Sequence, residues 1–233
     1  MWRNQFMLGL TLALALTMTA PAQLFKKKER AEPLLGVETD AADRLPPLSA
    51  AQQEQFADCV LKGFAAEGAD DYKQAFACYS KALALNKGAV TVWIRRAYVA
   101  AKLGQYEVAA RDLKEANSRP PVSVTDYLTL AWFLATGPFA EMRDGPRAVA
   151  CASKALREEP SADAYDMLAA GYAEMKNFGK AQENIRAAIK LYPESGRIEL
   201  LRRHLELYKE RKPWREVWGA DDKRMNAVLK ADR

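Results

Sequence analysis

Histidine and cysteine are scarce in this chain. Its 233 residues include a single histidine and three cysteines. One imidazole leaves most metal sites and acid–base pairs without their usual ligand or base, and three thiols are too few for a disulfide-dense scaffold. The sequence also lacks a glycine-rich phosphate loop and a pair of cysteines two residues apart. These absences predict a protein that is not an enzyme and that uses no metal or cofactor.

Neither sign of charge is in large excess. The 35 lysines and arginines exceed the 30 acidic residues by only five, so no nucleic-acid partner is expected, even though residues 95–119 are rich in basic side chains. Hydrophobic residues make up 49% of the chain, which excludes a mostly disordered protein.

One long apolar run is present, and it lies at the N-terminus. Residues 6–20 are almost all apolar, but the run is shorter than the roughly 20 residues that span a bilayer. Ala20 and Ala22 supply the small residues that precede a signal cleavage site. Residues 1–22 are therefore predicted to be a signal peptide, and the chain to be exported, periplasmic or secreted. The basic residues 26–30 favour an alternative, an uncleaved anchor in the inner membrane, which would be the chain's only contact with a membrane.

Residues 23–55 contain several prolines and show no helical period, which predicts a basic linker. Residues 212–233 form a charged tail that contains Trp214 and Trp218. These two tryptophans either fold onto the preceding helix or provide a second docking point for a partner.

A pattern of apolar and small residues recurs every 34 residues between residues 56 and 195. Each unit contains two amphipathic stretches separated by a short polar break, which is typical of a helical hairpin. Pro121 and Pro193 follow second stretches, where proline ends a helix. The first two units match at Tyr72 and Tyr106, Ala75 and Ala109, Tyr79 and Leu113, and Ala82 and Ala116.

This period and pattern resemble the tetratricopeptide repeat (TPR) family. With its N-terminal segment, the chain is similar to exported or membrane-tethered bacterial members. The resemblance implies an all-α fold, a right-handed superhelical solenoid of about four helical hairpins with a C-terminal capping helix. The best unit carries Trp93, Ala97, Gly104, Tyr106, Ala109, Ala116 and Pro121. The expected units are residues 56–89, 90–123, 124–161 with an insertion, and 162–195, followed by the capping helix over 196–211.

The capping helix differs from the repeats at Arg202. This bulky charged residue occupies a position that is small in the repeats, so no further helix is expected to pack there. His204 lies near Arg202 and beside Arg203, and we expect it to be solvated on the polar side of the helix.

In TPR proteins the first helix of each unit lines the concave face, and this implies which side chains face a ligand. An aromatic residue stands at one such position in the first three units, and Ala170 stands there in the fourth. We therefore expect an aromatic-lined groove that binds a peptide or protein segment. The residues expected to line it are Val60, Phe64, Ile94, Arg95, Tyr98, Lys102, Leu128, Trp132 and Asp166.

Other interpretations stay open. The aromatic side chains either form this groove or pack between neighbouring first helices or beneath the N-terminal linker. The leading functional interpretation is a non-catalytic adaptor in the cell envelope whose partner is another protein. The alternative is a self-associating scaffold, a homo-oligomer built from end-to-end or groove-to-groove contacts.

Two local features also allow two interpretations each. If Gly63 packs beside Ala75, Cys59 and Cys78 lie at the same height, and either a disulfide or two buried thiols result. In the inserted residues 136–146, Phe139 and Met142 either touch a partner or cover the ends of their own helices, while Asp144 is expected to cap the next helix.

Overall fold

Helices account for all regular secondary structure in the part of the chain that this computed structural model describes, residues 48–218. The expected all-α class is confirmed. The elements are α2 (Ala50–Gly68), α3 (Tyr72–Leu85), α4 (Val90–Lys102), α5 (Tyr106–Ser118), α6 (Val124–Thr136), the short 3-10 helix η4 (Ala140–Met142), α7 (Gly145–Glu158), α8 (Ala162–Glu174), α9 (Phe178–Leu191) and α10 (Ile198–Lys209).

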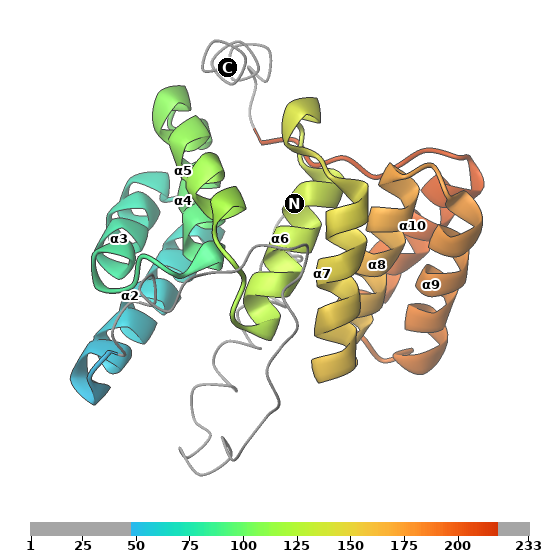
Figure 1. The fold of residues 1–233 in the computed structure, drawn as a ribbon, viewed down its shortest axis with the longest axis horizontal. Coiled ribbons are helices and arrows are strands. Elements are labelled where there is room, and N and C mark those ends of the chain that lie inside the picture. Colours follow the sequence, from blue (N-terminus) through green and yellow to red (C-terminus); the bar gives the residue numbers. More distant parts are fainter. Residues whose placement is uncertain (1–47, 219–233) are drawn as a thin grey trace.

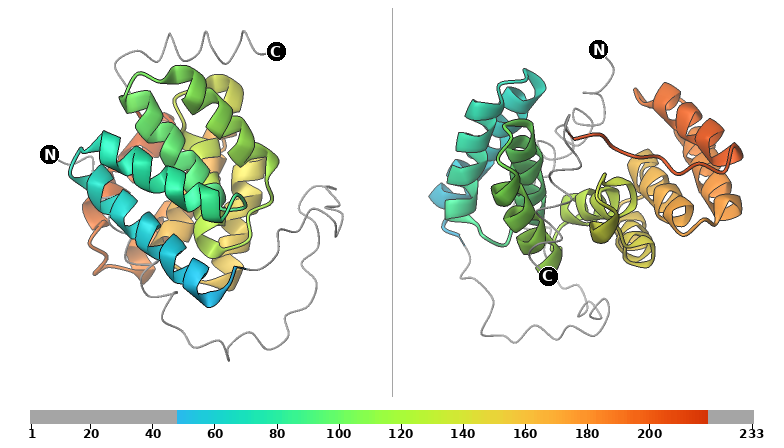
Figure 2. Two further views of the ribbon diagram at one scale, coloured as in Figure 1. Left: turned by 90° about the vertical axis from the view of Figure 1, so that its left-hand side faces the viewer. Right: turned by 90° about the horizontal axis from the view of Figure 1, so that it is seen from above.

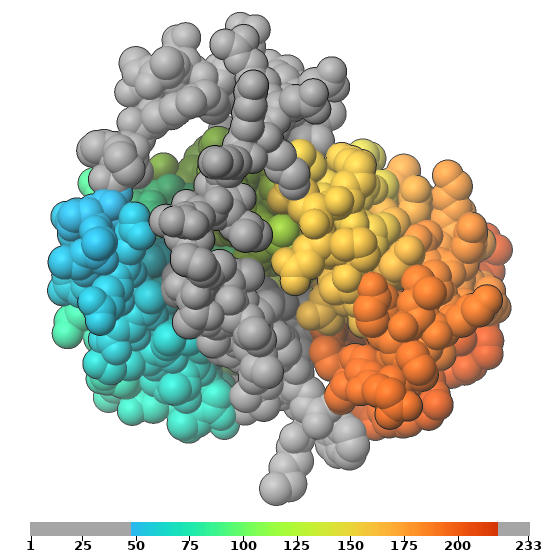
Figure 3. All heavy atoms as spheres, turned by 90° about the horizontal axis from the view of Figure 1, so that it is seen from below, coloured from blue at the N-terminus to red at the C-terminus, as the bar shows by residue number. Residues whose placement is uncertain are grey.

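Successive helices pair as hairpins: α2 with α3, α4 with α5, α6 with α7, and α8 with α9, while α10 packs against α9 (Figure 1). The first helices of neighbouring hairpins also touch, α4 against α6 and α6 against α8, so they form one layer of the solenoid. The two views of Figure 2 show the hairpins following one another along the array. In the space-filling view, α2 and α3 lie on the opposite side of the molecule from the C-terminal hairpin (Figure 3).

Polar residues before the helices fix where several of them begin. Ser49 accepts a hydrogen bond from the backbone of Gln52 and forms a capping box with it, so α2 begins at Ala50. Residues 50–55 are therefore helical and do not belong to the linker expected over residues 23–55. Asp144 accepts from the N–H of Arg147 at 3.0 Å and caps α7, as expected.

Small residues let the two helices of a hairpin approach closely. A Cβ on Gly63 would lie 2.4 Å from the ring of Tyr79, so this ring fills the space that the glycine leaves on α2. Ala75, Ala97 and Ala109 have no exposed surface.

We expect Gly63→Ala to lower the free energy of unfolding by about 1–3 kcal/mol, because the added methyl would displace the buried Tyr79 ring. Gly68→Ala is the matched control on the same helix, since a Cβ there meets nothing within 4 Å; its stability should be unchanged or slightly raised. Urea unfolding measures both. Equal stability of the two variants would show that the hairpin does not need the close approach.

None of the helices between residues 48 and 218 is long and apolar enough to cross a membrane. The predicted signal peptide (1–22) and the last residues of the tail (219–233) lie outside the described residues.

Candidate functional site

The predicted groove residues lie in one layer, and that layer is closely packed. The apolar and aromatic members have at most 8% of their surface exposed, and Arg95 and Asp166 have none. Lys102 is the exception and is half-exposed. The structure therefore corrects the expectation of an open aromatic groove. The physical reason is that the Arg95 guanidinium fills the space between the aromatic rings of α2 and α6, and that a C-terminal segment covers the rings of α4 and α6.

Arg95 joins the aromatic side chains of adjacent first helices. Its guanidinium lies 5.1 Å from the ring centroid of Phe64 on α2 and 5.7 Å from that of Trp132 on α6. It also forms a buried ion pair with Glu67, with 3.2 Å between Nη1 and Oε1. The Tyr79 hydroxyl donates to the other oxygen of Glu67 at 2.6 Å. This network links the first two hairpins to α6.

Burial raises the pKa of the Glu67 carboxyl above its ordinary value, while the positive charge of Arg95 and the hydrogen bond from Tyr79 pull that pKa down. Burial also raises the pKa of the Tyr79 hydroxyl well above its ordinary value, and the nearby Glu67 raises it further. The Glu67 carboxylate therefore depends on Arg95 for compensation of its charge.

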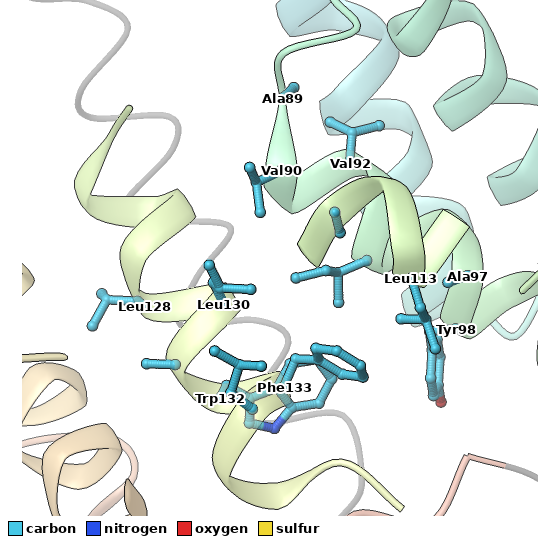
Figure 4. Packing of buried hydrophobic residues seen from close by; sticks show 14 of the residues in the cluster. Ala89, Val90, Val92, Ala97, Tyr98, Leu113, Leu128, Leu130, Trp132 and Phe133 are labelled. Atoms are coloured by element: carbon cyan, nitrogen blue, oxygen red, sulfur yellow. The ribbon is translucent and has the colours of Figure 1, made fainter. Parts of the chain in front are cut away.

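A segment beyond α10 lies against this layer. After α10 the chain returns along the array as an irregular segment (Figure 2, right) and ends its described part at Trp218, which has no exposed surface. The Trp218 ring stacks on Trp132, with centroids 6.1 Å apart and planes 24° apart. Three other rings surround it, at centroid distances of 5.5 to 5.8 Å: Tyr98, Phe133 and Phe139. Figure 4 shows Tyr98 on α4 together with Trp132 and Phe133 on α6.

Polar contacts hold the backbone and charges of this segment. The Glu216 N–H donates to the carbonyl of Thr136 at 2.8 Å. Arg215 donates to the carbonyl of Ala135 at 3.0 Å and forms an ion pair with Glu174 on α8. Glu174 also pairs with Arg143 at 3.1 Å. The segment is therefore fixed at the C-terminal ends of α6 and α8.

We call the four rings around Trp218, those of Tyr98, Trp132, Phe133 and Phe139, its seat. The insertion in the third repeat forms part of this seat. Phe139, with 1% of its surface exposed, packs edge to face against Trp218. Arg143 donates a hydrogen bond to the carboxylate of Glu174. Met142 is partly buried against the same core. Within the described chain, Phe139 thus contacts the chain's own C-terminal segment.

The Asp166 carboxylate organises the end of the array. It accepts a hydrogen bond from Arg197 at 3.2 Å and contacts Nδ1 of His204 at 2.8 Å. Arg197 also pairs with Asp163. Trp214 stacks on the His204 ring, with centroids 4.0 Å apart. Trp214 therefore folds onto the capping helix, whereas Trp218 packs against the aromatic rings of the first helices α4 and α6.

The expectation of a solvated His204 was wrong, since only 1% of its surface is exposed. Counting 34 residues from Ala170 gives His204, so the repeat period places it at the inward position of α10. Arg197 stands 34 residues after Asp163 and was missed in the sequence analysis, although opposite charges at equal repeat positions were a signal for the pair. No comparable signal pointed to Phe133. Phe139 was expected either to touch a partner or to cover the ends of its own helices, and its contact with Trp218 depends on the insertion and the tail, which lie outside the repeat pattern.

Asp166 and His204 are enclosed by Arg197 and Trp214, so the pair orients α10. Between residues 48 and 218, no group of three His, Cys, Asp or Glu side chains is arranged to hold a metal ion.

All three cysteines are buried free thiols. The Cys59–Cys78 disulfide is therefore not formed here, and the other interpretation, two buried thiols, describes the structure. Gln74 on α3 donates to the sulfur of Cys78 at 3.6 Å. Burial raises the pKa of Cys59, and it raises the pKa of Cys151 to about 11.

We expect a disulfide-exchange reagent to modify none of the thiols promptly in the folded chain near neutral pH, because they are buried and Cys59 and Cys151 are poor thiolate formers. All three should react once the unreduced chain is unfolded in guanidinium chloride. Only one reactive thiol in the unfolded chain would instead show that Cys59 and Cys78 are bonded.

Two solved structures of MamA resemble the chain: one at 20% identity with a TM-score of 0.41, covering 77% of this chain and 93% of that one, and one at 19% identity with a TM-score of 0.39, covering 72% and 92%. No curated protein sequence matches significantly. Residues 162–195 match the sequence model of the tetratricopeptide repeat. This match covers α8 and α9, one hairpin of the all-helical array.

Proposed function

We propose that this protein is a non-catalytic adaptor that holds an extended segment of another protein against the layer of first helices α4, α6 and α8. The matched repeat supports a protein-interaction or scaffold role. The observation that carries the finer proposal is the segment ending at Trp218. It is held on this layer by one buried aromatic ring, a backbone hydrogen bond and an ion pair, which are the contacts a bound peptide would use.

The charged side chains around the layer support a defined direction for the partner. Lys102, at the end of α4, is half-exposed and lies 5.2 Å from the Tyr98 ring. Asp163 and Glu174 on α8 are also only partly buried. A segment with acidic residues toward α4 and basic residues toward α8 would complement this arrangement.

Site-specific photo-cross-linking in the native cells tests the adaptor function. A photoactivatable residue at Lys102 should capture a discrete protein, whereas the same residue at the exposed Lys81 on α3 is the control and should not. An adduct of twice the chain's mass would mean self-association instead. The same adducts from both positions, or adducts from Lys81 alone, would contradict binding at the first-helix layer.

We further propose that the protein works in the cell envelope, on the strength of the predicted signal at residues 1–22. Mass spectrometry of the chain isolated from its native cells should then find Gln23 as the first residue. A membrane-bound chain that retains residues 1–22 would show the anchored alternative. A soluble chain that begins at Met1 would contradict both.

A further inference from the structure

The seat of Trp218 has the features of a recognition pocket for one aromatic side chain. Rings from α4, from α6 and from the inserted turn surround the indole. Aromatic residues in such pockets dominate the energy of many protein interfaces. Around the pocket stand a carbonyl acceptor, at Thr136, and a carboxylate, at Glu174.

We propose that residues 213–218 are a built-in occupant of this seat, which a partner displaces by presenting an extended segment of the same chemistry: a buried aromatic side chain with a basic residue a few positions before it. This inference rests on the proposed adaptor function, and it adds the partner's chemistry and a regulatory step. The inference and the adaptor function can fail separately, because peptide binding tests the first and cross-linking tests the second.

The charge arrangement at Glu174 favours a basic ligand residue. Its carboxylate pairs with Arg143 of the inserted turn and with Arg215 of the segment, and all three side chains are half-buried. Arg143 is itself held by the carbonyls of Gly137 and Pro138, at 3.0 and 3.3 Å. Arg143 therefore keeps Glu174 in place for whichever basic residue approaches along α6.

The segment is held more weakly than the helices it covers. Val217 is 56% exposed, and residues 213–216 are half-buried. The indole N–H of Trp218 is buried without a hydrogen-bond partner among the described residues. An unsatisfied buried donor weakens docking. A segment with few hydrogen bonds can therefore leave its seat while the helices stay folded.

An intramolecular occupant lowers the apparent affinity of every competitor. The competitor binds only the fraction of molecules whose seat is open, so its apparent dissociation constant rises as that fraction falls. Weakening the occupant should therefore strengthen binding in trans, even though nothing has been added to the seat.

A synthetic labelled peptide of residues 212–218 (KPWREVW) tests this by fluorescence anisotropy with the full chain. We expect it to bind Trp218→Ala at least about tenfold more tightly than the unmodified chain. Val217→Ala is the matched control, because that side chain is exposed, and it should bind like the unmodified chain. A peptide with alanine in place of its last tryptophan should bind none of these proteins.

Arg215→Ala provides a second route if Trp218→Ala proves unfolded by circular dichroism. It removes the ion pair to Glu174 and leaves the aromatic layer intact, so it too should bind the peptide more tightly than the unmodified chain. The proposal is overturned if folded Trp218→Ala and Arg215→Ala bind the peptide no better than the unmodified chain does.

The cross-linking experiment separates this inference from the adaptor function. Peptide binding to Trp218→Ala without any protein captured at Lys102 would support the seat and contradict the adaptor function. Equal capture of one protein by the unmodified chain and by Trp218→Ala would support the adaptor function and contradict displacement of the segment.

Discussion

Replacing Arg95 by methionine should lower the free energy of unfolding by about 3–5 kcal/mol near neutral pH. The reason is the buried carboxylate that the substitution leaves behind. Glu67 is 3% exposed, and Arg95 is the cation that it pairs with. The substitution also removes the guanidinium from between Phe64 and Trp132, although methionine preserves much of the apolar volume.

This loss of stability should shrink as the pH falls. The pKa of Glu67 in the folded chain lies above its ordinary value of 4.5, and without Arg95 it rises further because burial is then less opposed. A carboxyl whose pKa is higher in the folded state binds protons preferentially in that state, so stability increases as the pH drops from the folded pKa toward the ordinary one. The variant should therefore be closer in stability to the unmodified chain at about pH 5 than near neutral pH.

Urea unfolding at both pH values measures the effect. The control is the double variant Glu67→Gln/Arg95→Met, which has no buried charge and keeps an acceptor for Tyr79. It should be more stable than Arg95→Met near neutral pH and should lose most of the added pH dependence. A double variant as unstable as the single one would show that the packing of Arg95, not its charge, is what matters.

Trp132→Ala should also destabilise the array by about 3–5 kcal/mol. The Trp132 ring has 1% of its surface exposed and lies between the Arg95 guanidinium and the Trp218 ring. Its removal leaves a cavity at the point where α4, α6 and the C-terminal segment meet. Thermal or urea unfolding of the full chain gives the magnitude.

The matched comparison is Trp218→Ala, which removes the other ring of the same stack. This substitution should lower the free energy of unfolding by no more than about 2 kcal/mol, because a segment that detaches locally contributes only its own docking free energy. Equal losses for Trp132→Ala and Trp218→Ala would mean that the segment is an integral part of the core, and would contradict its role as a displaceable occupant.

The repeat period explains how much of the fold was predictable. A 34-residue spacing of small and apolar residues locates each hairpin, because every unit repeats the same close approach between helices. Asp144 could be assigned as a cap because capping depends only on nearby backbone. The start of α2 was predicted too late, since Ser49 and Gln52 begin the helix before the apolar period does.

The site was less predictable, because its character depends on contacts between distant residues. The repeat pattern brought Phe64, Tyr98 and Trp132 to one layer but did not show that Arg95 would be buried among them with Glu67. The seat of Trp218 is formed by an inserted turn and a segment outside the repeats, and neither follows the period. His204 is buried because its repeat position, and not the polar character of its neighbours in the sequence, sets the direction of its side chain.

Hydrogen–deuterium exchange on the unmodified chain most directly tests the central claim that a displaceable segment occupies the first-helix layer. The informative amide is that of Glu216, which donates to Thr136. The account predicts that it exchanges faster than the amides of α4 and α6, at a rate that low urea concentrations barely change, because only local opening is required. Exchange at the same rate and with the same urea dependence as α4 and α6 would contradict the account.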